Sequence, residues 1–82
     1  AENSISIFPN PFFSSTTIKT NGYLKNATLT LYNSYGQTVK QEKNISGKTV
    51  SLSRDNLPNG LYFIRLTEES KIIAVEKIII TN

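Results

Sequence analysis

The sequence predicts an all-β domain, a sandwich of about seven antiparallel strands. Apolar and polar residues alternate with period two through most of the chain, which is typical of strands that bury one face. Turn signals containing Gly, Asn, Ser or Pro recur about every 8–12 residues. No segment shows a convincing helical period. The 82 residues form one small domain, and a chain of this size buries only about 60–65% of its unfolded surface.

About seven segments carry the strand pattern: residues 4–8, 16–20, 27–32, 37–43, 48–52, 61–67 and 71–80. The first segment stops at Pro9 and Pro11, because the two prolines remove backbone donors and hold Asn10 extended. The second segment is rich in β-branched residues, and Asn21-Gly22 after it predicts a turn.

The third segment places Ala27, Leu29 and Leu31 on one face of its strand. Residues 33–36 after it read as a type I turn that Gly36 closes. The return strand is mostly polar, so we expect it at an edge of the sheet.

Ser46-Gly47 predicts the next turn, and the strand after it directs Val50 and Leu52 inward. Residues 53–56 then cross over to the most informative segment of the chain. Asp55 is expected to cap the turn before Leu57 by a hydrogen bond from its side chain to the nearby backbone, as aspartates in turns commonly do.

Residues 57–66 combine a rigid turn with an aromatic-rich strand. Pro58 is suited to the first central position of a β-turn, and Gly60 closes it without a Cβ clash. Tyr62 stands two places after the glycine. This spacing is typical of an immunoglobulin-like β-sandwich, in which the tyrosine hydroxyl bonds to backbone upstream. Tyr62, Ile64 and Leu66 share one face of the strand, opposite Leu61, Phe63 and Arg65.

The last expected strand follows a hairpin at residues 68–70 and breaks the alternation at residues 78–80, where three isoleucines are consecutive. One interpretation is a strand covered on both faces, or one with a bulge near Glu76. The other is an exposed C-terminal strand that serves a partner by edge pairing or groove docking.

The composition argues against catalysis. Cysteine and histidine are absent, which removes the commonest nucleophile, base and metal ligands. Glu68 and Glu69 are adjacent, so a strand would send them to opposite faces. The glycines are isolated and form no phosphate-binding loop. We therefore predict no enzyme, no metal and no cofactor.

The charge and hydropathy patterns exclude two further classes. The net charge is +3, but the lysines are scattered, so nucleic-acid binding is not expected. No apolar run reaches the roughly 18 residues of a membrane span.

A carbohydrate-binding or adhesive module appended to a secreted enzyme is the alternative. Exposed aromatic side chains would carry its contacts, although burial of such residues against the core is common. The candidates are Phe12, Phe13, Tyr23 and Tyr35.

Four blocks in order carry a family resemblance: residues 8–12 (Phe-Pro-Asn-Pro-Phe), 31–39, 57–63 and 77–80 (Lys-Ile-Ile-Ile). Together they resemble the C-terminal sorting domain (type A) of the bacterial type IX secretion system, over nearly all of the chain. The family's structural positions match at Pro9, Pro11, Gly36, Pro58, Gly60 and Tyr62. Its recognition strand matches at Lys77, Ile78, Ile79 and Ile80. Many relatives end on a basic residue, whereas this chain ends Ile80-Thr81-Asn82.

The resemblance implies a seven-strand immunoglobulin-like sandwich at the end of a secreted cargo protein of a Gram-negative, Bacteroidota-type bacterium. Its implied partners are the type IX translocon, an outer-membrane shuttle carrier and a sortase-like peptidase. The cargo would pass through the periplasm to the cell surface or the medium. Because the chain begins at Ala1 and has no methionine, we expect residues 1–82 to be a fragment of a longer protein. Cleavage would fall at or just before its N-terminal end.

Overall fold

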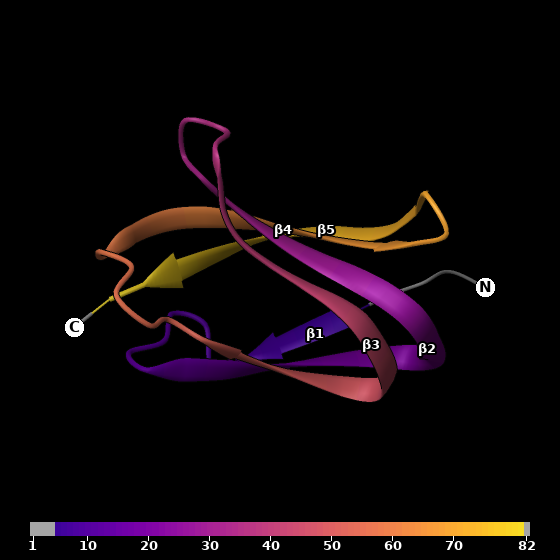
Figure 1. Ribbon diagram of the computed structural model, residues 1–82. Coiled ribbons are helices and arrows are strands. Elements are labelled where there is room, and N and C mark those ends of the chain that lie inside the picture. The colour runs from indigo at the N-terminus through magenta and orange to yellow at the C-terminus, as the bar shows by residue number, and fades with distance from the viewer. Residues whose placement is uncertain (1–4, 82) are drawn as a thin grey trace.

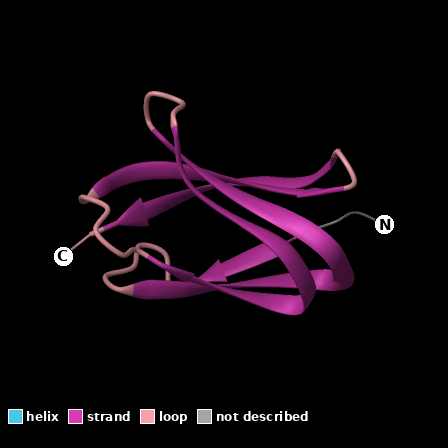
Figure 2. Ribbon diagram, viewed as in Figure 1, coloured by secondary structure: helices cyan, strands magenta, loops and turns pink. Residues whose placement is uncertain are grey.

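The computed structural model describes residues 5–81, in which five β-strands and no helix occur. The strands are β1 (Ile5–Phe8), β2 (Ser15–Asn33), β3 (Thr38–Ser53), β4 (Gly60–Glu68) and β5 (Lys71–Ile80). Figure 2 shows them joined by short loops. The predicted all-β class is confirmed. Ser4, where the first strand was expected to begin, lies outside the described residues.

The strand number differs from the prediction because β2 and β3 are each one long, bent strand. The turns predicted at Asn21-Gly22 and Ser46-Gly47 are wrong, since both pairs lie within strands. The register of β2 on β3 shifts between Lys19 and Leu24 and at three further points. Such bulges bend and twist a strand without reversing it, so the chain keeps its direction where the sequence suggests a hairpin.

The sheet has the order β1-β2-β4-β5, with β3 paired to β2 and every pairing antiparallel. β1 pairs with residues 17–20 of β2, whereas β4 pairs with residues 28–33. The two ends of β2 therefore belong to different halves of the sheet. In Figure 1 the sheet curls, so that the half with β1 lies across from the half with β4 and β5.

The core fills the space between the two halves. The buried apolar side chains form one cluster: Phe12, Ile18, Leu24, Ala27, Leu29, Leu31, Val50, Leu52, Tyr62, Ile64, Leu66, Ile78 and Ile80. Val50 and Leu52 of the fifth segment are inward as predicted, and the residues predicted to share a face in the third and sixth segments are the buried ones. Period-two alternation predicted them because a strand directs successive side chains to opposite faces.

β3 lies at an edge, as its polar sequence predicts, since it pairs with β2 alone. Charged side chains follow this edge, a common protection against unwanted strand pairing. One of them, Lys40, reaches the crossing after β3, where its Nζ lies 2.8 Å from Asp55 Oδ2. Asp55 also accepts a hydrogen bond from Ser53 Oγ. The carboxylate thus contacts side chains, which differs from the backbone cap that we expected.

β5 has the bounds that the sequence predicts. The first interpretation of this segment, a strand covered on both faces or a strand with a bulge near Glu76, does not agree with the structure. Ile78 and Ile80 are buried while Ile79 is 40% exposed, so the strand is not covered on both faces. The register shift on β4 falls between Leu66 and Thr67. The pairing there leaves Ile73 as the extra residue, so the bulge does not lie near Glu76.

Candidate recognition site at the end of the C-terminal strand

The motif blocks of the sequence meet at one end of the curled sheet, where β5 ends (Figure 1). Residues 9–12 lie along the outer edge of β5, and residues 57–62 lead into its neighbour β4. The turn at residues 33–36 shares a groove with residues 57–62. Segments far apart in the sequence thus surround the strand that the resemblance marks for recognition.

The loop between β1 and β2 covers the outer edge of β5 with hydrogen bonds. Asn10 Nδ2 donates to the Lys77 carbonyl at 3.2 Å, and Asn10 Oδ1 accepts from the Ile79 amide at 3.0 Å. The Phe12 amide then donates to the Ile79 carbonyl at 3.0 Å, and the Thr81 amide donates to the Phe12 carbonyl at 2.9 Å. The Asn10 side chain therefore replaces a peptide group, and the β5 edge is closed from residue 77 to 81.

The same loop is anchored to the core. Thr16 Oγ1 donates to the Pro9 carbonyl at 2.6 Å, and Thr16 is itself buried. The Phe12 side chain is 2% exposed and belongs to the core cluster. The peptide bonds that precede Pro9 and Pro11 are both cis. These contacts hold Asn10 against β5.

Arg54 ties three segments together at this end of the molecule. Its guanidinium donates to the Leu57 carbonyl from Nη2 at 2.9 Å and to Asn59 Oδ1 at 2.7 Å. Nη1 donates to the Phe13 carbonyl at 3.0 Å and to the Thr81 carbonyl at 3.4 Å. A planar guanidinium with several fixed donors suits this task. Arg54 thus joins the loop before β2, the crossing before β4 and the end of β5.

Sequence reasoning missed Arg54 and the role of Asn10. The Ile79 amide that Asn10 bonds and the Thr81 carbonyl that Arg54 bonds lie far away in the sequence. The Pro-Asn-Pro motif marks Asn10 but does not show what its side chain bonds. One signal was available for Arg54: it precedes the Asp55-Asn56 turn in a chain whose other cations are nearly all lysines. Arginine is favoured where several carbonyl oxygens converge.

The tyrosine corner that the sequence predicts is present. Tyr62 is buried, and its hydroxyl donates to the Pro58 carbonyl at 2.7 Å. The hydrogen-bonded turn lies earlier than expected, because the Leu57 amide donates to the Arg54 carbonyl at 3.0 Å. Gly60 has a φ of 152°, in the region that favours glycine.

A shallow groove of about 240 Å³ separates the corner from the β2–β3 turn. Gly36 closes that turn by donating to the Asn33 carbonyl at 3.0 Å, with a φ of 84°. The Asn33 side chain accepts from the Tyr35 and Gln37 amides. The groove is lined by Asn33, Ser34, Tyr35, Val39 and residues 57–62. Two of the motif blocks therefore border one surface.

The four residues of the expected recognition strand divide into two pairs. Ile78 and Ile80 are in the core, and Lys77 and Ile79 point outward and are exposed. The backbone edge beside Lys77 and Ile79 is occupied by Asn10 and Phe12. Only the side chains of Lys77 and Ile79 are thus open to contact from outside.

The aromatic candidates of the alternative function do not form a common platform. Phe12 is buried in the core, as is common for such residues, so it cannot contribute to an exposed platform. Phe13 precedes β2, Tyr23 lies in the bulged middle of β2, and Tyr35 lies in the β2–β3 turn. Phe13 and Tyr23 have different cationic neighbours, the Arg54 guanidinium at 6.0 Å and Lys48 Nζ at 5.6 Å.

The Asp55 carboxyl has a shifted pKa at this end of the molecule. Hydrogen bonds from Lys40 and then Ser53 lower the pKa of the exposed Asp55 carboxyl below its ordinary value. Among residues 5–81 no three His, Cys, Asp or Glu side chains gather in a way that could hold a metal ion. The same residues contain no helix that could cross a membrane.

Comparison with known families supplies the class of this domain. The family model for the secretion system C-terminal sorting domain matches residues 6–81. A comparison with curated proteins found no match. Since the matched residues span nearly the whole chain, the chain belongs to this family, as the resemblance indicates. It is a C-terminal sorting signal for type IX secretion, a system whose cargo reaches the cell surface or the medium.

Proposed function

We propose that this domain is a non-catalytic address label that directs the protein preceding it across the outer membrane, and that a sortase-like peptidase then removes it. The label would be read by the translocon in the periplasm and passed to an outer-membrane shuttle carrier. The observation that carries the proposal is the family match over residues 6–81, together with the convergence of the motif blocks on the end of β5.

We also interpret the curled sheet as a form of the immunoglobulin-like sandwich. β2 and β3 bend at their bulges and contribute to both halves, so five continuous strands provide about seven strand segments. The tyrosine corner supports this interpretation, because Tyr62 bonds the Pro58 carbonyl as in such sandwiches.

The direction of the chain suits a label at the end of a cargo. β1 begins at Ile5, at the end of the sheet opposite to the end of β5 (Figure 1). A preceding cargo therefore leaves the domain on the far side from Thr81. The proposed recognition end stays open to the export machinery while the cargo is attached.

The test is a fusion of a signal peptide, a periplasmic reporter and residues 1–82, expressed in a type IX-competent host. The reporter is expected at the cell surface or in the medium, without the domain after processing, as mass spectrometry would show. In a strain that lacks the translocon the reporter should stay in the periplasm. Equal export in both strains would contradict the proposal.

A second fusion tests the recognition strand without disturbing the core. Deletion of residues 77–82 removes Ile78 and Ile80, which are buried, so loss of export would not separate recognition from folding. The exposed pair Lys77→Ser and Ile79→Ser keeps the core, and we expect it to lower export. Ser51→Ala on β3 is the matched exposed control. Normal export of the double variant would locate the signal elsewhere.

The carbohydrate-binding alternative gains no support from the placement of the aromatics. A pull-down with polysaccharides tests it directly. Retention that depends on Tyr23 or Tyr35 would favour it over the sorting function.

A further inference from the structure

The outward face of β4 and β5 carries a contiguous apolar patch. Leu61 lies opposite Ile79, Phe63 opposite Lys77, and Arg65 opposite Val75 in the strand register. The apolar members are between 36% and 55% exposed. The outer patch is defined as Leu61, Phe63, Val75, Ile79, Arg65 and Lys77.

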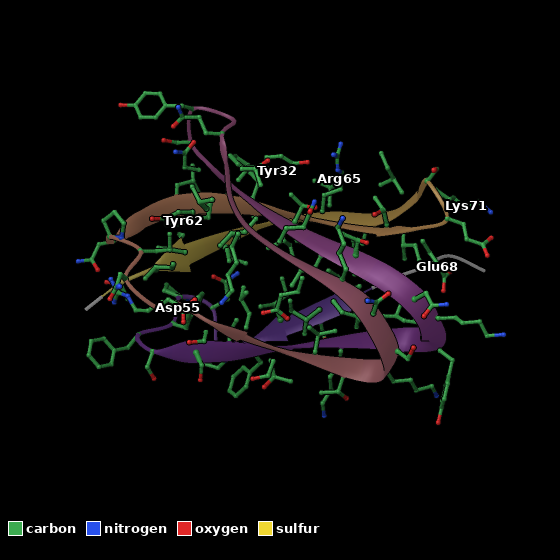
Figure 3. All side chains as sticks on the ribbon, viewed as in Figure 1. Tyr32, Asp55, Tyr62, Arg65, Glu68 and Lys71 are labelled. Atoms are coloured by element: carbon green, nitrogen blue, oxygen red, sulfur yellow. The ribbon has the colours of Figure 1, made fainter. Side chains whose placement is uncertain are left out.

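The charge of the outer patch has one sign. In Figure 3 Arg65 and Tyr32 project from the outer side of the sheet, and the Arg65 guanidinium lies 5.2 Å from the Tyr32 ring. The acids of β4 and β5 lie on the opposite face, because Glu76 pairs with inward-facing Ile64 and Glu68 accepts the Lys25 amide at 2.7 Å. The outer patch therefore presents two cations beside apolar side chains and no carboxylate.

The backbone of β5 is poorly suited to strand addition. Residues 77–81 are covered by Asn10 and Phe12, and the bulge at Ile73 interrupts the rest of the edge. Bulged or covered edges resist pairing with another strand. A partner would thus reach the terminal strand through side chains on the outer patch.

The positive charge of the outer patch limits which kinds of partner can bind to it. A second copy placed face to face would add two further cations to the interface and no carboxylate, which is repulsive. A membrane surface is recognised by clusters of about four to eight basic residues, and the outer patch has two. An acidic, partly apolar protein surface satisfies both the cations and the exposed apolar groups.

We propose that the outer patch is a docking surface for a protein whose own surface combines apolar side chains with carboxylates. This rests on the proposed function, since the partner would belong to the export machinery that reads the domain. Lys77 and Ile79 contribute to the outer patch directly. Ile78 and Ile80 contribute only by holding β5 in place.

The test reverses the charges of the outer patch in the reporter fusion. Arg65→Glu with Lys77→Glu should lower export by about tenfold or more, because like charges then face the acidic partner. Lys19→Glu with Lys48→Glu, in the half of the sheet that contains β1, makes the same change in net charge, and we expect export within about twofold of the unchanged fusion. Thermal unfolding of the purified chains checks that each variant folds.

An apolar variant keeps the test independent of charge. Ile79→Ser with Leu61→Ser should also lower export while unfolding cooperatively. If a charge variant does not fold, Lys77→Glu alone replaces it, since Lys77 is exposed at the edge of the outer patch. Normal export of the folded variants would overturn the proposal.

The outcomes separate this proposal from the proposed function. Export of the unchanged fusion that does not need the translocon contradicts the proposed function. Translocon-dependent export that survives charge reversal contradicts only the docking surface. Two further results would also overturn it: a dimer in sedimentation experiments that Ile79→Ser dissociates, or binding to phosphatidylglycerol vesicles that the charge reversal abolishes.

Discussion

Two side chains complete the hydrogen bonding where β5 ends. Asn10 supplies one donor and one acceptor to the β5 edge, and Arg54 donates to carbonyls of the corner and of Thr81. Backbone groups at a sheet edge otherwise invite pairing with other chains. Single side chains therefore decide whether the backbone edge at the end of β5 is covered.

Removal of the Tyr62 hydroxyl should destabilise the fold. Tyr62→Phe loses the hydrogen bond to the Pro58 carbonyl, and we expect about 1–2 kcal/mol lower free energy of unfolding. Denaturant unfolding measures this change. Tyr35→Phe, at an exposed turn residue, is the control and should change the stability by less than about 0.5 kcal/mol. Equal effects of both variants would contradict the role of the corner.

Asp55 should make a pH-dependent contribution. Its pKa is lowered in the folded state, first by the hydrogen bond from Lys40. The contribution is therefore present above the unfolded pKa of about 3.9 and is lost as the pH falls through the lower folded value. The difference in thermal stability between the unchanged chain and Asp55→Asn should shrink as the pH falls from about 5 to about 3. A Lys40→Met background is expected to remove most of this change, and parallel curves at all pH values would contradict the assignment.

At the scale of elements, the bent strands β2 and β3 explain the shape of the sheet. Three of the four register shifts between them lie where the sequence has Asn, Gly and Ser, and Asn26, Asn44 and Gly47 have φ values of 52°, 61° and 107°. The same residue types favour turns. Pattern alone could not decide between a turn and a bulge, because the pairing partner across the sheet makes the difference.

The β4–β5 hairpin can be improved. Glu69 and Ser70 form its two-residue turn with φ values of 51° and 66°, and neither residue type favours that region. Glu69→Asn with Ser70→Gly supplies the pair that a type I′ turn prefers, so we expect about 1 kcal/mol of added stability. Thermal unfolding measures the gain. Glu69→Gln with Ser70→Ala removes the same charge and should give no gain. A loss of stability with Asn-Gly would contradict the turn assignment.

The hydrogen bonds that Asn10 makes to the edge of β5 can be removed without removing the strand. Asn10→Ala takes away the acceptor of the Ile79 amide, so hydrogen exchange at this amide should become faster. The stability should fall by about 1 kcal/mol. Asn56→Ala, an exposed asparagine of the crossing before β4, is the control and should leave exchange at Ile79 unchanged. Slow exchange at Ile79 in the Asn10→Ala variant would show that other groups hold the edge.

At the scale of the whole molecule, the two faces of β5 have different surroundings, and we assign the proposed recognition to the outward one. Its inward isoleucines close the core between the halves of the sheet, and its outward side chains belong to the outer patch. Folding and recognition therefore place separate demands on one short strand. Substitutions can test the two demands separately.

Ile78→Ala should cost about 2–5 kcal/mol, because it leaves a cavity in the core that both halves share. Ile79→Ala removes a partly exposed side chain, and we expect a cost below about 1 kcal/mol. Denaturant unfolding with an unchanged m-value compares the two. Similar costs for both variants would mean that the two faces of β5 are not distinguished as the structure shows.

The sequence by itself determined the all-β class, the bounds of β5, which residues share a face of each core strand, and the family. These features depend on period two and on short motifs, both of which are local. The tertiary structure decided that β2 and β3 each run through a predicted turn, because bulges depend on pairing across the sheet. It also decided which side chains of β5 are exposed to solvent. Asn10 and Arg54 act on groups far away in the sequence, and only folding brings those groups within hydrogen-bond distance.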